Sequence, residues 1–131
     1  MAYSVLIVDD DQQVRMMFRL VLERHGYIVD EAPNGAEALR KLLNQTPDVI
    51  LLDILMPMLG GEAVLQRIRQ MPSLYNTKVL VVTAYPRFEK TANLDRVDRF
   101  LVKPILPAHL VQAVAEVLAI ADVELESDRQ P

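Results

Sequence analysis

Residues 48–57 read Asp-Val-Ile-Leu-Leu-Asp-Ile-Leu-Met-Pro. An uninterrupted apolar run of this kind, bounded by acidic residues, is typical of a strand that is covered on both faces, as in a parallel sheet. We therefore predict a buried strand over residues 48–52 that ends at Asp53, followed by a loop that contains Pro57 and two glycines. Asp53 is thus expected at the carboxyl end of a central strand, where open α/β sheets bind their ligands.

Four further segments predict strands of the same sheet: residues 4–8, 28–32, 78–82 and 100–102. Three of these runs stop at polar side chains, namely at Asp9 and Asp10, at Thr83, and at Lys103. The segment over residues 28–32 is more polar and is expected near an edge. Because parallel strands end at the same edge, we expect three carboxylates, a hydroxyl and an ammonium group to share one crevice.

Between these strands, apolar residues recur with helical spacing. The predicted inner faces are Val14, Met17, Phe18, Val21 and Leu22; Ala38, Leu39, Leu42 and Leu43; Val64, Leu65, Ile68 and Met71; and Leu110, Val111, Val114, Val117 and Leu118. Asn34 is expected to cap the second helix, and Pro107 suits the first turn of the last one. Apolar residues are few and irregular over residues 85–99, so a fourth helix there is expected to be short or irregular.

Strand and helix alternate five times, which predicts a doubly wound α/β fold with a parallel sheet and helices on both faces. The chain of 131 residues has the length of one domain. We expect this domain over residues 1–120. The chain is acidic and polar from Asp122 onward, so residues 121–131 are expected to be a flexible tail or the start of a linker.

Composition excludes several classes of protein. The chain has no cysteine, which excludes disulfides, zinc-thiolate sites and thiol catalysis. Its net charge is −4 without a basic block, which argues against direct nucleic-acid binding. No apolar run approaches the roughly 20 residues that cross a bilayer, and the start lacks the features of a secretion signal. We therefore expect a cytoplasmic protein without membrane contact.

The predicted cluster of Asp9, Asp10 and Asp53 suits a hard divalent cation. Carboxylates alone, without His or Cys nearby in sequence, favour Mg²⁺ or Mn²⁺ over zinc. The three negative charges are balanced only when a divalent ion joins Lys103. A carboxylate beside a metal and a lysine can attack a phosphoryl group, and Asp53 is the best candidate because it stands alone at its strand end. The hydroxyl of Thr83 could donate to a phosphoryl oxygen.

Each of these residues also has a simpler interpretation. The acid pair could merely cap the next helix, because Asp favours helix N-termini. Thr83 alone could also be a helix cap, and Lys103 alone a solvated charge. The occurrence of all of them at strand ends favours the functional interpretation. Phe100 is the least specific member of the set, because an aromatic residue at the last strand is often part of the core.

Together these motifs resemble the receiver domain of two-component response regulators, the CheY-like proteins, over residues 3–118. The resemblance rests on Asp9-Asp10, on Asp53 followed by Met56-Pro57, on Thr83-Ala84, and on Phe100 with Lys103-Pro104. It implies a flavodoxin-like five-stranded sheet in the order 2-1-3-4-5. It also implies that a phosphoryl group passes to this domain from the phosphohistidine of a sensor kinase or a phosphotransfer protein, in the presence of Mg²⁺.

The resemblance also implies a role for each site residue. Asp53 is the phosphoacceptor. Asp10 binds the metal directly, Asp9 acts largely through water, and the backbone carbonyl of Leu55 completes the metal shell. Thr83 and Lys103 bind the phosphoryl group, and Phe100 is the aromatic residue that switches with Thr83. The Lys103-Pro104 bond resembles the family's cis peptide. Such a domain regulates an output protein and catalyses only its own phosphorylation and dephosphorylation. A weak homodimer is a further partner that we consider.

The chain departs from the family pattern in three places. The interval from Thr83 to Lys103 is about two residues short, and a short or irregular fourth helix there puts dimerisation through that face in doubt. Met58 replaces a common glycine. Leu55 and Tyr85 occupy two positions that flank the phosphoryl group in the family, and an apolar and an aromatic side chain there could exclude the hydrolytic water. We therefore expect slow self-dephosphorylation.

Three other functions remain as alternatives. A metal-dependent phosphatase with an aspartyl intermediate usually has a second acid two residues after the nucleophile, where this chain has Leu55. A receiver-like scaffold that is not phosphorylated is disfavoured by the complete set of site residues. A nucleotide-binding fold is disfavoured because no glycine-rich phosphate loop follows any strand.

Overall fold

The structure is a computed structural model and describes residues 2–84 and 97–129, with the backbone alone from residue 120 onward. Its strands are β1 (Ser4–Val8), β2 (Ile28–Ala32), β3 (Val49–Asp53), β4 (Lys78–Thr83) and β5 (Arg99–Val102). Its helices are α1 (Gln12–Arg24), α2 (Gly35–Leu42), α3 (Gly61–Arg69) and α4 (Pro107–Arg129), with a short 3₁₀ turn, η1 (Pro72–Leu74). None of the helices in these ranges has the length and apolar character needed to span a bilayer.

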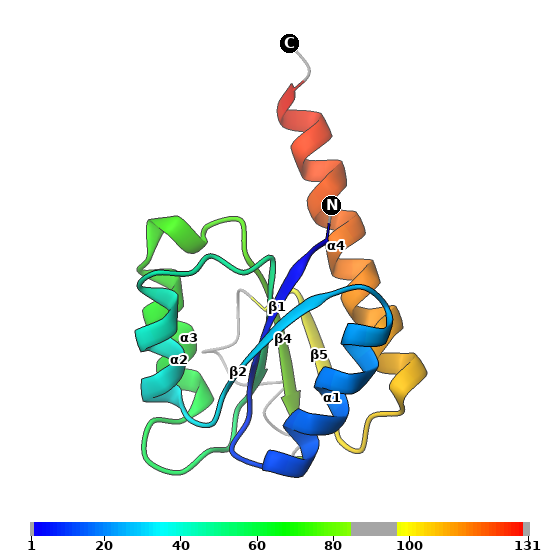
Figure 1. The fold of residues 1–131 in the computed structure, drawn as a ribbon. Helices are drawn as coiled ribbons and strands as arrows, with labels where there is room; N and C mark the ends of the chain where they lie inside the picture. Colours follow the sequence, from blue (N-terminus) through cyan, green and yellow to red (C-terminus); the bar gives the residue numbers. More distant parts are fainter. Residues whose placement is uncertain (1, 85–96, 130–131) are drawn as a thin grey trace.

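The five strands form one parallel sheet in the order β2-β1-β3-β4-β5, as the resemblance implied. Helices α2 and α3 pack together on one face of the sheet, and α1 and α4 pack together on the other (Figure 1). This arrangement explains why the central strands carry apolar residues at all positions between their ends. All residues of β3 and β4 are buried, because a parallel sheet between two helical layers has no solvent-facing side.

Side-chain capping determines where the first two helices begin. The Asp11 carboxylate accepts hydrogen bonds from the backbone N–H groups of Gln13 (2.9 Å) and Val14 (3.3 Å) at the start of α1. The Asn34 side chain accepts from the N–H of Glu37 (2.8 Å) and caps α2, as predicted. Neither Asp9 nor Asp10 is the cap of α1, so the carboxylates of both residues can contribute to the acidic cluster at the ends of the strands.

The structure differs from the sequence-based expectations at element boundaries. Asp48 precedes β3 and Asp53 is its last residue, so this strand is shifted by one position. Leu43, expected on an inner face, is 74% exposed because α2 ends at Leu42. Helix α4 continues to Arg129 and rises beyond the sheet in Figure 1, where a flexible tail or the start of a linker was expected from residue 121. Most of the segment expected to hold a short or irregular fourth helix, residues 85–96, lies outside the described residues.

Candidate phosphorylation site

The strand register brings the predicted site residues to one edge of the sheet. Val8, the last residue of β1, is paired with Leu52, so Asp9 lies beside Asp53. Thr83, the last residue of β4, is paired with Val102, which precedes Lys103. These strand ends meet at the lower edge of the sheet in Figure 1, which is the carboxyl edge.

Asp9, Asp10 and Asp53 form one acidic cluster. One carboxylate oxygen from each residue lies within 4.8 Å of the other two. Asp9 is 2% and Asp53 5% exposed, whereas Asp10 is on the surface. Two buried carboxylates and one exposed carboxylate therefore surround a position that solvent can reach from the side of Asp10.

Both carboxylate oxygens of Asp9 already have hydrogen-bond donors from the chain. Oδ1 accepts from the backbone N–H of Asp11 at 2.9 Å, and Oδ2 accepts from the ammonium group of Lys103 at 2.7 Å. Oδ1 of Asp53 accepts from the N–H of Leu55 at 3.2 Å. The Asp10 carboxylate is thus the more available of the paired acids for direct metal coordination, and Asp9 is better suited to act through water.

Lys103 connects the acids to the neighbouring strands. Its ammonium nitrogen lies 3.6 Å from Oδ2 of Asp53, in addition to its contact with Asp9. Its backbone N–H donates to the carbonyl oxygen of Thr83 at 2.7 Å. The Lys103-Pro104 peptide bond is cis, as the resemblance implied. The lysine side chain therefore lies between Asp9 and Asp53 and is linked to the end of β4.

The electrostatics of the cluster follow from burial and proximity. Burial and the neighbouring charge of Asp9 raise the pKa of Asp53 to about 6, although Lys103 and the Leu55 amide act in the opposite direction. Burial acts to lower the pKa of Lys103, but its hydrogen bond to Asp9 and the charges of Asp9 and Asp53 outweigh that effect and raise it. Asp53 is therefore ionised at neutral pH, but burial and the charge of Asp9 disfavour its ionised form. A cation bound beside it would stabilise that form.

The remaining predicted residues lie around this cluster. Thr83 is fully buried at the end of β4, and Phe100 is half-buried in β5, packed against the core on the α2–α3 face. Leu55 follows Asp53 in the β3–α3 loop, and its side chain is 49% exposed. Tyr85 lies outside the described residues.

The donor set fits a hard divalent cation. It consists of carboxylate oxygens, with no His or Cys among the described clusters of ligating residues. Oxygen-only sites favour Mg²⁺ or Mn²⁺. Asp9, Asp10 and Asp53 are the residues that could hold the ion, and the Leu55 carbonyl is the further ligand that the resemblance implies.

Comparison with known proteins agrees with this geometry. The family model for the response regulator receiver domain matches residues 5–115. The chain belongs to this family. Receiver domains are in general signalling modules rather than enzymes that turn over a separate substrate.

Two curated relatives differ in the share of their own length that this chain matches. An uncharacterized 14.6 kDa protein of Leptolyngbya boryana is 34% identical over 115 residues, covering 86% of this chain and 88% of the relative. The transcriptional regulatory protein ResD of Bacillus subtilis is 36% identical, covering 88% of this chain but only 48% of ResD. The chain thus spans about half the length of ResD and of several other curated regulators that it matches.

Among solved structures, the response regulator TrrA of Thermotoga maritima in complex with Mg²⁺-BeF is similar to this receiver domain. The two are 30% identical with a TM-score of 0.81, over 88% of this chain and 98% of TrrA. A member of the family therefore binds Mg²⁺, which is consistent with the acidic cluster described above.

Two backbone positions of this receiver domain between the end of β3 and the first residue of α3 have special requirements. A Cβ atom at Gly61 would overlap the carbonyl oxygen of Asp53 and approach Cα of Ile54 to 2.6 Å, so only glycine fits there. Met58 has a φ of 66° and a fully exposed side chain. The resemblance indicates a glycine at the position of Met58. The backbone there is left-handed, a conformation that glycine adopts more readily than residues with a Cβ atom, which explains the family's preference.

Sequence reasoning did not identify two residues that lie near the site. Asp11 was not expected as the cap of α1, although its position directly before the helix is a usual signal for a cap. Arg15 was not singled out either, yet Nη1 of its guanidinium donates to the backbone carbonyl of Asp9 at 2.6 Å. The i,i+4 spacing of Arg15 and Arg19 places both on one face of α1, but their shared partner, Glu31, is apparent only from the fold.

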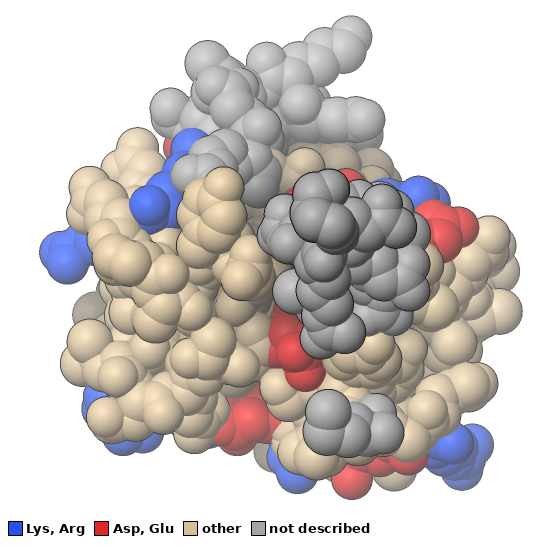
Figure 2. Space-filling model, turned by 90° about the horizontal axis from the view of Figure 1, so that it is seen from above, with Lys and Arg blue, Asp and Glu red and all other residues tan. Residues whose placement is uncertain are grey.

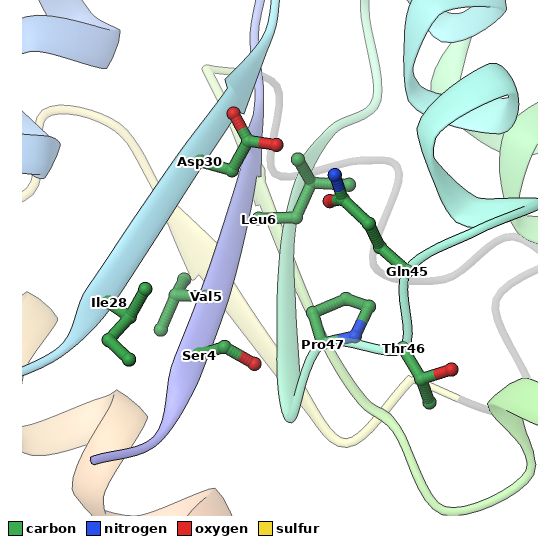
Figure 3. Close-up of a pocket in the computed structure, with 8 residues that line it drawn as sticks. All are labelled: Ser4, Val5, Leu6, Ile28, Asp30, Gln45, Thr46 and Pro47. Carbon is green, nitrogen blue, oxygen red and sulfur yellow. The ribbon is translucent and has the colours of Figure 1, made fainter.

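The opposite edge of the sheet is chemically different. A hollow of about 340 Å³ lies there, lined by residues from the beginnings of β1 and β2 and from the α2–β3 loop (Figure 3). Asp30 is its one acidic residue, and it is paired with Lys41 at 2.7 Å. Figure 2 shows the molecule from the side of this edge, with positive and negative side chains interspersed over the visible surface and not gathered into one charged area. This hollow is therefore unrelated to the acidic cluster.

Proposed function

We propose that this chain is a phospho-accepting receiver domain, placed over residues 1–120, that takes a phosphoryl group onto Asp53 and thereby changes its binding to a partner protein. The observation that carries the proposal is the juxtaposition of Asp53 with two further carboxylates and the Lys103 ammonium. The ammonium lies 3.6 Å from Asp53 and 2.7 Å from Asp9. A buried acid with these neighbours is suited to nucleophilic attack on a phosphoryl group.

In the proposed reaction, an oxygen of the Asp53 carboxylate attacks the phosphorus of a phosphohistidine on the donor protein. The new O–P bond forms as the P–N bond breaks, and the departing histidine nitrogen keeps the electron pair and is protonated from solvent. A pKa of about 6 leaves Asp53 ionised at neutral pH and therefore able to attack. Bound Mg²⁺ supplies electrostatic stabilisation to the phosphoryl oxygens.

Lys103 and Thr83 have complementary roles in this proposal. Lys103 turns from its hydrogen bond with Asp9 toward a phosphoryl oxygen, a short movement because the ammonium already lies between the two acids. The Thr83 hydroxyl donates to another phosphoryl oxygen. Charge-assisted hydrogen bonds of this type are about twice as strong as neutral ones and can shift the ends of β4 and β5. Phe100, half-buried in β5, follows this shift as the switch residue.

Exposed apolar side chains near the site fit a protein donor. Met58 is fully exposed, Leu106 is 61% exposed and Leu55 is 49% exposed, all in loops at the carboxyl edge of the sheet. We infer a sensor kinase or phosphotransfer protein as the donor and a separate protein or an attached effector domain as the output. Reception of the phosphoryl group from such a donor fits a cytoplasmic location.

The experiment that tests the proposal is intact-mass measurement after incubation with acetyl phosphate and Mg²⁺. One phosphoryl adduct is expected on the wild-type chain, and none on Asp53→Asn or after addition of a chelator. Circular dichroism of Asp53→Asn shows whether that variant is folded. If the wild-type chain binds Mg²⁺ but acquires no adduct, the proposal is wrong and a scaffold that is not phosphorylated becomes the better description.

A further inference from the structure

Arg15 connects the turn after β1 to the edge strand β2. Its Nη1 donates to the backbone carbonyl oxygen of Asp9 at 2.6 Å, and its Nε donates to Oε1 of Glu31 at 3.2 Å. The Arg15 side chain is only 13% exposed, and that of Glu31 is 24% exposed. The planar guanidinium group thus bonds two acceptors on different elements in one fixed orientation.

The carbonyl that Arg15 binds belongs to the peptide group between Asp9 and Asp10. The carboxylate of Asp9 is held separately, by the Asp11 amide and the Lys103 ammonium. The orientation of the Asp9-Asp10 peptide determines the direction in which the Asp10 side chain leaves the backbone. Because Asp10 is exposed, the backbone that precedes it restricts its direction more than side-chain packing does.

We propose that Arg15 is a positioning residue for the metal site: by holding the Asp9 carbonyl, with Glu31 orienting its guanidinium, it directs the Asp10 carboxylate toward Asp53. The inference rests on the proposed function, because it assumes that the acidic cluster binds Mg²⁺. Residues that orient metal ligands from outside the coordination shell typically contribute about 10- to 100-fold in metal affinity. Arg15 acts in this manner through backbone rather than through a ligand side chain.

Arg19 provides a matched control on the same helix. It donates to the other oxygen of the same carboxylate, Oε2 of Glu31, at 2.8 Å, and to Glu23 at 2.6 Å. Its hydrogen bonds within the described residues go to these two acids and not to the turn at Asp9. Removal of either arginine therefore takes one positive charge from α1 and one bond from Glu31, but only removal of Arg15 releases the Asp9 carbonyl.

The test is calorimetric titration of the chain with Mg²⁺ at pH 7.5, on wild type, Arg15→Gln, Arg15→Lys and Arg19→Gln. We expect Mg²⁺ affinity to fall about 10-fold or more in Arg15→Gln and less than about 2-fold in Arg19→Gln, which keeps the bond to the Asp9 carbonyl. Arg15→Lys is expected to lie between them, because an ammonium group can reach one acceptor but cannot reproduce the planar fork. Exchange of the Asp11 amide proton, measured with chelator present, is expected to be faster in Arg15→Gln only.

The possible results separate this inference from the proposed function. If the wild-type chain does not bind Mg²⁺, the proposed function fails first. If wild type binds Mg²⁺ and both Arg15 variants bind equally well, the positioning role is wrong while the proposed function stands. Equal losses in Arg15→Gln and Arg19→Gln would also overturn it, because they would indicate a general charge effect. Should Arg15→Gln not fold, the comparison of folded Arg15→Lys with Arg19→Gln decides the question.

Discussion

Nζ of Lys103 lies 2.7 Å from Oδ2 of Asp9, although 94 positions separate the two residues in sequence. The same nitrogen lies 3.6 Å from Oδ2 of Asp53. The ammonium group therefore bonds the neighbouring acid directly and acts on the nucleophile mainly through its charge. This arrangement favours the ionised form of Asp53 without a short bond between the ammonium group and Oδ2.

Replacement of Lys103 tests this electrostatic role. Lys103→Gln is expected to raise the pKa of Asp53 above its value of about 6, because the lysine charge opposes the effects of burial and of Asp9. Phosphorylation by a small phosphodonor is expected to slow by about 10²-fold, the usual effect of losing one preorganised donor. The pKa is measured by carbon NMR of the carboxyl groups without metal. Lys41→Gln, which removes a distant pair with Asp30, is the control, and equal Asp53 pKa values in both variants would contradict the account.

The raised pKa of Asp53 predicts a pH-dependent stability. Between about pH 4 and pH 6 the folded chain binds more protons at Asp53 than the unfolded chain, so this residue's contribution to stability falls as pH rises through that window. The charged groups that face it are Asp9, Asp10 and Lys103. In chelator at pH 7.5, Asp53→Asn is expected to be more stable than wild type by about 1–2 kcal/mol, and the difference should vanish near pH 4.

Urea unfolding at both pH values measures this difference, and Asp30→Asn provides a control of opposite sign. Although partial burial acts to raise the pKa of Asp30, its hydrogen bond with Lys41 lowers the pKa overall. The Asp30 carboxylate therefore favours the folded state at neutral pH, and Asp30→Asn should destabilise the chain there. A lower stability of Asp53→Asn than of wild type at pH 7.5 would show that burial does not disfavour the charged Asp53.

Much of this architecture could be predicted from sequence, because its signals are local. Uninterrupted apolar runs such as residues 49–52 indicated buried parallel strands, and polar residues at their ends indicated the edge where the site lies. The strand order and the cis peptide came only from the family resemblance. Parallel strands end at the same edge of a sheet. The sequence therefore predicted that Asp9 lies beside Asp53, but it did not predict the side-chain contacts between them.

Other features depend on contacts that sequence does not display. Leu43 belongs to the helical pattern of α2, but the helix ends before it and no element covers its side chain. Helix α4 extends to Arg129, beyond the apolar helical pattern that ends at Leu118, because acidic and polar residues can continue a helix without packing against the core. The role of Arg15 depends on Glu31 in β2, a pairing set by the tertiary fold. The division of the chain at residue 120 remains a prediction.

Gly61 is expected to be indispensable for the position of Asp53. In Gly61→Ala the added Cβ meets the backbone of Asp53 and Ile54, neither of which can move without displacing the site. We expect a loss of about 2–3 kcal/mol in stability, by overpacking, together with weaker Mg²⁺ binding.

Gly60→Ala is the matched control. Its Cβ would lie 3.5 Å from the Ile54 carbonyl oxygen, an ordinary contact, and loss of the glycine at the helix N-cap is expected to cost at most about 1 kcal/mol. Similar losses in the two variants would show that the backbone approach at Gly61 is not limiting.

Slow self-dephosphorylation is expected from the apolar side chain of Leu55. It is 49% exposed two residues after Asp53, where it can exclude the hydrolytic water. Leu55→Asn offers that water a polar partner, and its backbone N–H still bonds Asp53, so the phosphoryl lifetime should shorten without loss of the site. Loss of the adduct with time is followed by intact mass, with Met58→Asn in the same loop as control. A phosphoryl lifetime of only seconds in the wild-type chain, or a lifetime that is unchanged in Leu55→Asn, would contradict this expectation.

The most direct test of the central claim is to locate the phosphoryl group itself. After phosphorylation with acetyl phosphate and Mg²⁺, reduction with borohydride converts an aspartyl phosphate into homoserine, and peptide mass mapping then identifies the residue. The account predicts homoserine at position 53 in the wild-type chain, with no modified acid elsewhere. Modification at Asp9 or Asp10, or at a histidine, would contradict the assignment of Asp53 as the phosphoacceptor.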